Sequence, residues 1–118
     1  MSSAAAPHFV VDTRRDGSAE VVQVTGEVDI ATAPLLRAVL DTVVGRRPSL
    51  VEVDLSGATF LDAHALSVLT AVRRRLAGRH ARLVLRDPSP VALRLLELTG
   101  MTHAFEIVTG SAEVRRAG

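Results

Sequence analysis

Strand-like and helix-like segments alternate along most of the chain, and this alternation limits its fold more than any other feature. Two β-prone runs, Phe9–Asp12 and Ala19–Gly26, are separated by Arg14–Gly17, whose Asp-Gly pair is a hairpin signal. The segments that follow complete the order β-β-α-β-α-β-α-β-α. This order predicts one α/β domain with a mixed β-sheet, in which an N-terminal antiparallel hairpin joins parallel central strands and the helices pack on the sheet.

Helical segments are recognised by apolar residues at helical spacing and by residues that favour helix ends. Thr32, Asp62 and Ser89 are the predicted N-caps, and a proline in the first turn supports the first and third of these helices. The helices are expected from Thr32 to Val44, from Asp62 to about Ala77, and from Ser89 until Gly100. The residues expected to face the core are Leu35, Leu36, Val39, Leu40, Val43 and Val44, then Leu66, Leu69, Val72 and Leu76, then Leu95, Leu96 and Leu98.

The remaining segments complete a single domain. Strands are expected at residues 50–55, 82–86 and 105–108, and Ser111 is the predicted cap of a short last helix. A length of 118 residues and a hydrophobic content of 47% are enough for one core. Residues 1–8 are expected to be a flexible tail, so the domain covers residues 9–118.

The composition argues against several classes of function. The chain has no cysteine, which removes disulfides, thiolate metal sites and cysteine nucleophiles. Its four histidines are scattered, and no phosphate-binding glycine loop follows a strand, so we expect no metal and no cofactor. Acidic and basic residues nearly balance, without arginines interleaved with aromatics, so no direct DNA binding is expected. With no long apolar run and no signal peptide, we expect a cytoplasmic protein without membrane insertion.

Two charged clusters have both a functional and a structural explanation. Asp54, Asp62 and His64 are close in sequence, as an acid–base site would require. However, Asp54 ends a strand and Asp62 caps a helix, so we predict that the protein is not an enzyme. The run Arg73–Arg75 is compatible with an anion patch, but a solvated helix face is the commoner role, and we favour it.

The helix start at Asp62 has the properties of a regulatory position. A strand that leads through a loop into a helix N-terminus forms an anion site, because free backbone N–H groups and the positive end of the helix dipole point there. A phosphate at this point would leave the fold intact and change the surface that a partner meets. The position therefore suits a phospho-switch that controls docking. It is an unexpected place for His64, because a cation is disfavoured at this end of a helix.

Three stretches, in order and at fitting spacing, resemble the STAS domain as found in anti-sigma factor antagonists. They are GEVDIATAP (Gly26–Pro34), LVEVDLSGATFLD (Leu50–Asp62) and LVLRDPSPVALRLLELTGM (Leu83–Met101). The resemblance covers about residues 9–110 and implies a non-enzymatic STAS module that docks on an anti-sigma factor of kinase-like fold. In that family the helix start usually reads D-S-S-G. The partner, which is also a serine kinase, phosphorylates the second serine and is then released.

In this chain the tetrapeptide is Asp62-Ala63-His64-Ala65, so His64 stands at the phospho-acceptor position. The departure implies that serine phospho-switching is absent at position 64. Three roles for His64 stay open: a plain replacement, which we favour, a ring phosphorylated by a different kinase, and a pH-responsive contact. The partner surface that the resemblance implies comprises the entry to the first helix and the start of the second, namely Asp29, Ala31, Thr32, Ala33, Asp62, Ala63, His64, Ala65 and Leu66.

Other functions remain as alternatives at this point. The resemblance also fits a STAS subunit of an ABC transporter that docks on its ATPase. A small-molecule or nucleotide binder would instead use the helix N-terminus as its anion site. A weak homodimer is left open.

Overall fold

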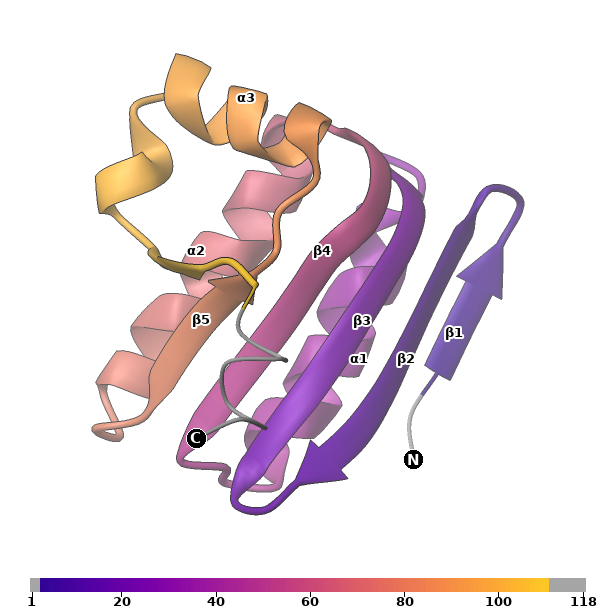
Figure 1. Cartoon of the computed structure of the whole chain (residues 1–118). Coiled ribbons are helices and arrows are strands. Elements are labelled where there is room, and N and C mark those ends of the chain that lie inside the picture. Colours follow the sequence, from indigo (N-terminus) through magenta and orange to yellow (C-terminus); the bar gives the residue numbers. More distant parts are fainter. Residues whose placement is uncertain (1–2, 111–118) are drawn as a thin grey trace.

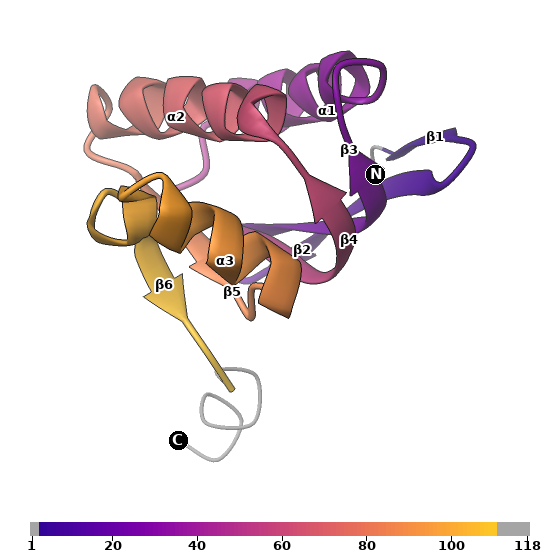
Figure 2. The same cartoon turned by 90° about the horizontal axis from the view of Figure 1, so that it is seen from above.

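One mixed sheet carries the whole domain. The computed structural model describes residues 3–110, and within them six strands lie in the order β1-β2-β3-β4-β5-β6. Helices α1 and α2 lie together on one face of the sheet, whereas α3 packs at one end of it (Figures 1 and 2). The elements are β1 (Ser3–Ala6), β2 (Phe9–Asp16), β3 (Ala19–Val28), α1 (Ala33–Gly45), β4 (Leu50–Leu61), α2 (Ala63–Ala77), β5 (Arg82–Arg86), α3 (Pro90–Leu98), the 3-10 turn η1 (Met101–His103) and β6 (Glu106–Val108).

The strand pairing confirms the predicted mixed sheet. Strands β2 and β3 form the antiparallel hairpin, closed by the pair Asp16 and Ala19. The turn uses Gly17 with φ of +63°, a conformation that favours glycine. Strands β3, β4, β5 and β6 then pair in parallel through helical connections. The carboxyl ends of these central strands therefore meet at one edge of the sheet.

The N-terminal segment differs from the flexible tail that we expected. Residues 3–6 form β1, which pairs antiparallel with β2 through Ala4 and Val11 and through Ala6 and Phe9. This pairing satisfies backbone groups along an edge of β2, and Ala4 and Ala6 are partly buried against the core. An alanine run carries no strand periodicity, so the sequence did not reveal this strand. The short helix expected from Ser111 lies outside the described residues.

Strand β4 continues beyond the segment expected from the sequence. It runs through Ser56–Thr59 as far as Leu61, directly before α2. The small residues of this stretch resemble a loop, yet Gly57 and Ala58 pair with β3, across register shifts between Gln23 and Thr25 and between Gly26 and Glu27. Such irregularities let a strand bend while its pairing continues. The longer strand leads straight into the helix start.

The helices bury the predicted faces, with one exception. The stripe of Leu66, Leu69, Val72 and Leu76 in α2 is buried, which confirms the orientation of that helix. In α3 the buried residues are Ala92 and Leu96, four positions apart, and Leu95 is half-buried. The expectation for Leu98 is wrong, because its side chain is exposed. Two positions beyond Leu96 turns a side chain by about 200°, away from the buried face.

Candidate docking site at the starts of two helices

The starts of α1 and α2 lie side by side at the carboxyl edge of the sheet. Strands β3 and β4 pair in parallel through Val28 and Leu61. The backbone N–H of Asp62 then donates to the carbonyl oxygen of Val28 over 3.3 Å. Because Asp29 follows Val28 directly, the two predicted parts of the site form one continuous edge. Figure 2 looks down on this end of the molecule.

A compact polar turn built on Asp29 and Thr32 precedes α1. Oδ1 of Asp29 accepts from the backbone N–H groups of Ala31 (2.9 Å) and Thr32 (3.1 Å). The Thr32 hydroxyl donates to the carbonyl oxygen of Glu27 (2.8 Å) and accepts from the N–H of Asp29 (2.9 Å). The turn is therefore held from both sides, which fixes the direction in which the chain enters α1.

This turn shows that Thr32 does not cap α1 with its side chain, although a cap was expected, and it explains the lowered pKa of Asp29. Thr32 occupies the N-cap position, but its side chain makes no hydrogen bond to the helix, because the hydroxyl is directed back toward Glu27. The backbone N–H of Thr32 lowers the pKa of the Asp29 carboxyl below its ordinary value, and the N–H of Ala31 and the Thr32 hydroxyl act in the same direction against the opposing effect of desolvation.

Asp62 caps α2 as predicted and also contacts His64. Its Oδ1 accepts from the backbone N–H of His64 at 2.9 Å. The Nδ1 atom of the His64 ring lies 3.2 Å from the same oxygen. The ring itself is half-exposed. A carboxylate at this distance offsets the unfavourable interaction between an imidazolium and the positive end of the helix, which explains how the helix start accommodates a histidine.

The predicted site residues differ in their access to solvent. Ala31, Ala63 and His64 are exposed, and the acidic Asp29 and Asp62 are half-buried. The other four predicted members are buried and support the edge from below, namely Thr32, Ala33, Ala65 and Leu66. A partner would therefore meet two carboxylates, one imidazole and small apolar side chains.

Two large apolar residues at this edge were missed by the sequence analysis. Ile30, in the turn before α1, is 69% exposed, and Phe60, near the end of β4, is 44% exposed. Phe60 pairs across the strands with Glu27, one position before Val28. The sequence did contain one signal for an exposed apolar residue. An isoleucine stands between Asp29 and Ala31 in a polar turn, where a side chain is not expected to be buried. Aromatic side chains such as that of Phe60 contribute strongly to the energy of protein interfaces, and an exposed isoleucine adds apolar contact area.

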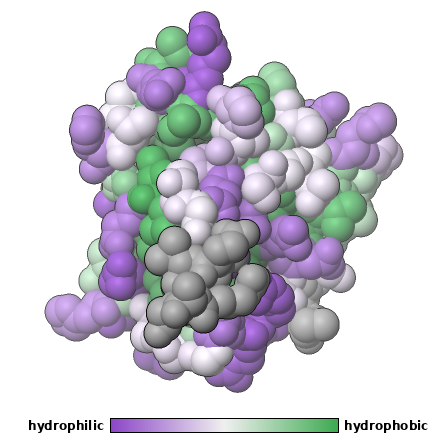
Figure 3. All heavy atoms as spheres, viewed as in Figure 1, coloured by the Kyte–Doolittle hydropathy of each residue, from purple (hydrophilic) through white to green (hydrophobic). Residues whose placement is uncertain are grey.

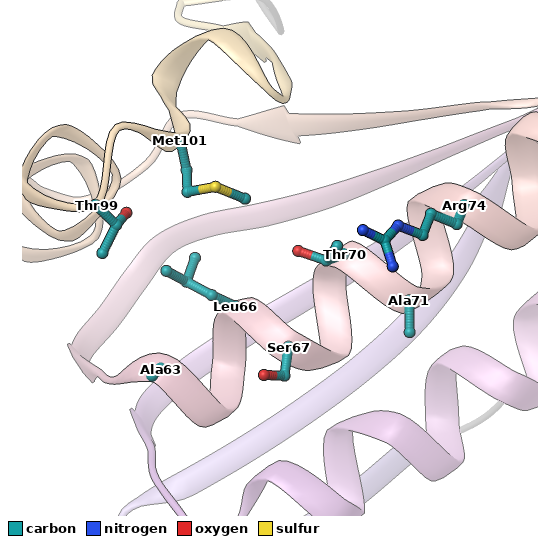
Figure 4. Close-up of a pocket in the computed structure, with 8 residues that line it drawn as sticks. All are labelled: Ala63, Leu66, Ser67, Thr70, Ala71, Arg74, Thr99 and Met101. Atoms are coloured by element: carbon teal, nitrogen blue, oxygen red, sulfur yellow. The ribbon is translucent and has the colours of Figure 1, made fainter.

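A shallow groove extends the edge along α2. Its volume is about 480 Å³, and it lies between α2 and the chain that follows α3 (Figure 4). The side chain of Leu66 points toward Met101 across this groove, and Arg74 stands at the far end of the labelled row on α2. The lining residues are Ala63, Leu66, Ser67, Thr70, Ala71, Arg74, Thr99 and Met101. The groove begins at the helix start, so both features face the same side of the molecule.

The arginine run of α2 has three different environments instead of one solvated face. Arg73 lies over the ring of Phe105, 5.5 Å from its centroid. Arg75 forms an ion pair with Asp41 of α1 at 2.5 Å, and Arg74 is exposed at the groove. Only the last of these matches the expectation of a simply solvated side chain.

Two further properties bear on the kind of site. Among residues 3–110, no three His, Cys, Asp or Glu side chains are grouped in a way that would hold a metal ion. No helix in this part of the chain is long and apolar enough to span a membrane.

The fold and the edge together define a class: a small α/β domain that presents a capped helix start next to a second helix start. Residues 11–109 match the family model described as "Mlab, STAS domain", and the chain belongs to the STAS domain family. Within residues 3–110, the six-strand sheet and three helices form the STAS-like fold that the sequence predicted, with β1 as an additional strand.

The relatives of the chain include anti-sigma factor antagonists. It is 30% identical over 91 residues to the anti-sigma-B factor antagonist of Listeria monocytogenes, covering 77% of this chain and 80% of that protein. It is 27% identical over 103 residues to the anti-sigma-F factor antagonist RsfB of Mycobacterium tuberculosis, and this match covers 86% of this chain and 84% of that protein. A crystal structure of an anti-sigma factor antagonist from Mycobacterium paratuberculosis superposes on this chain with a TM-score of 0.76 at 30% sequence identity. The superposition covers 89% of this chain and 90% of that one.

Proposed function

We propose that this chain is an anti-sigma factor antagonist that acts by binding alone, in the cytoplasm. It docks on an anti-sigma factor of kinase-like fold through the edge formed by the starts of α1 and α2. The observation that carries the proposal is the hydrogen bond between Asp62 and Val28, which joins the two helix starts into one surface. The names of the relatives in both comparisons support the same partner class.

The exposed side chains at the edge support a role in docking. Ile30 and Phe60 supply apolar contact area, and Asp29, Asp62 and His64 supply polar groups around it. Apolar anchors surrounded by polar side chains are the usual anatomy of a protein interface. The groove beside Leu66 gives a partner a further apolar depression to fill.

We infer further that docking is not switched by serine phosphorylation at position 64. The ring of His64 offers no hydroxyl to a serine kinase, and its Nδ1 atom lies beside the capping carboxylate of Asp62. The protein would then act constitutively whenever its partner is present. This interpretation keeps His64 as a plain replacement in an edge that still binds.

The proposal is tested by capture from the native host followed by a measured affinity. Immobilised protein should retain an anti-sigma factor of kinase-like fold, identified by mass spectrometry. Ile30→Asp should weaken its binding, measured by titration calorimetry, by at least about tenfold, because one exposed apolar anchor is lost. Val10→Asp makes the same kind of change at an exposed apolar residue of β2 and should leave the affinity unchanged.

Two outcomes would contradict the proposal. Capture of an ABC transporter ATPase would favour the transporter-subunit alternative. Equal affinities for Ile30→Asp and the unsubstituted protein, with both folded, would remove this edge from the interface.

A further inference from the structure

The groove along α2 brings apolar side chains together next to the proposed docking edge. Leu66 of α2 and Met101 of η1 point toward one another across it, and Ala63 and Ala71 line it on α2 (Figure 4). On the sheet face away from α1 and α2, which Figure 3 shows, hydrophilic side chains separate the apolar areas. Because the groove begins directly after the capping Asp62, it continues the edge formed by the two helix starts.

Arg74 places one positive charge at the far end of this groove. Its two neighbours in the chain are engaged elsewhere, since Arg73 lies over the ring of Phe105 and Arg75 pairs with Asp41. The side chain of Arg74 is exposed and forms no ion pair with the described part of the chain. No aspartate or glutamate lines the groove. A carboxylate brought by a partner would therefore meet a cation that has no competing internal partner.

The length and the walls of the groove suit a short helix. Ala63 and Arg74 are eleven positions apart on α2, about 16 Å or three helical turns. The lining residues lie on α2, at the end of α3 and in η1, so no strand edge is offered for backbone pairing. An extended segment would leave its own N–H and C=O groups unpaired over apolar side chains, whereas a helix satisfies them internally. A small molecule would stay largely open to solvent in so shallow a groove.

We infer that the groove receives an amphipathic helix of the partner, which places an apolar side chain against Leu66 and Met101 and an acidic side chain against Arg74. Leu66 and Arg74 are eight positions apart, about 12 Å along α2. Side chains about seven or eight positions apart share one face of a helix. The partner helix is therefore expected to carry a large apolar residue and an aspartate or glutamate at that spacing, the usual arrangement of helix-in-groove recognition. The inference deepens the proposed function and rests on it for the identity of the partner.

Two synthetic peptides test the chemistry of the groove on the full-length chain. Each is an alanine-based helix with blocked ends and with leucine and one charged residue at the stated spacing, glutamate in one peptide and lysine in the other. Titration followed by NMR should shift the backbone amide signals of Leu66, Ala71, Arg74 and Met101 with the glutamate peptide. This peptide should bind about threefold or more tightly than the lysine peptide, and added salt should reduce the difference.

A change of charge at position 74 sharpens this test. Arg74→Glu should reverse the preference, so that the lysine peptide binds more tightly. Arg94→Glu is the matched control, because Arg94 is exposed on α3 and does not line the groove, and it should keep the preference for glutamate. A denaturant melt of each variant checks that the fold is retained. The absence of signal shifts along the groove, or equal affinities of the two peptides for the unsubstituted protein, would overturn the inference.

The captured partner separates a failure of this inference from a failure of the proposed function. Arg74→Glu should weaken its binding by about threefold or more, and Arg94→Glu should leave the affinity unchanged. An unchanged affinity for Arg74→Glu beside a weakened Ile30→Asp would overturn the groove inference and leave the docking edge in place. A weakened Arg74→Glu beside an unchanged Ile30→Asp would support the groove and contradict the docking edge.

Discussion

The imidazole Nδ1 of His64 lies 3.2 Å from Oδ1 of Asp62, the same oxygen that accepts the backbone N–H of His64. One carboxylate oxygen therefore caps α2 and faces the ring. This arrangement joins the stability of the helix start to the identity of residue 64. It also shows why a histidine is tolerated where a free cation would be unfavourable.

The capping role of Asp62 leads to the first prediction. Asp62→Ala should lower the free energy of unfolding by about 0.5–2 kcal/mol, because the N–H of His64 loses its acceptor. Asp62→Asn keeps an acceptor oxygen, so it should lower the free energy of unfolding by less than Asp62→Ala does. Urea denaturation of the three proteins gives the comparison, and a larger loss in the asparagine variant would contradict the capping geometry.

The second prediction concerns modification at the helix start. Incubation with a cognate anti-sigma kinase and ATP should leave residue 64 unmodified, as checked by intact mass and peptide mapping. Phosphate on Ser56, Thr59 or Ser67 would mean that the switch has moved. Stoichiometric phosphohistidine at His64 would rule out a plain replacement.

A third prediction separates docking from folding. His64→Asp places a carboxylate at the positive helix end, which favours stability by about 0.3–1 kcal/mol. The adjacent carboxylate of Asp62 opposes this gain, so the net change in the free energy of unfolding should stay within about 1 kcal/mol. The added negative charge should weaken binding of the captured partner, although less than a phosphate would.

The matched control for the third prediction is His64→Ser, which should retain binding. Calorimetric affinities are measured beside a denaturant melt for each variant. If His64→Asp binds as tightly as the unsubstituted protein while remaining folded, the helix start does not belong to the interface.

The fourth prediction tests the orientation of α2. Leu69 is fully buried in the core, so Leu69→Ala should lower the free energy of unfolding by about 2–5 kcal/mol through lost burial and a cavity. Ser67 is exposed at the groove, and Ser67→Ala should change the free energy of unfolding by less than about 0.5 kcal/mol. The reverse order in denaturant melts would mean that the helix is rotated.

A fifth prediction follows from the lowered pKa of Asp29, whose main cause is the backbone N–H of Thr32. A carboxyl with a lowered pKa in the folded state stabilises the fold above its unfolded pKa, near the ordinary value of 3.8, and loses this contribution as the pH falls through the lowered value. Asp29→Ala should therefore destabilise the protein most near neutral pH. The difference between the two proteins should shrink below pH 3.8, as measured by thermal melts across the acid range.

Local patterns in the sequence were sufficient for much of the fold. The order of strands and helices after the hairpin, the caps at Asp62 and Ser89, and the buried stripe of α2 all depend on residues within one or two helical turns. Those interactions can be read from spacing and residue type alone. The resemblance added the importance of the α2 start and identified His64 as the departure from the family motif.

Tertiary structure decided the features that depend on partners far apart in the chain. Parallel pairing of β3 with β4 sets Asp29 beside Asp62, and strand pairing turns residues 3–6 into β1. Packing leaves Ile30 and Leu98 exposed, and a hydrogen bond to Glu27 takes the Thr32 hydroxyl away from the helix. Register between strands and the burial of one face of a short helix are set by the packed molecule as a whole, so no local spacing in the sequence determines them.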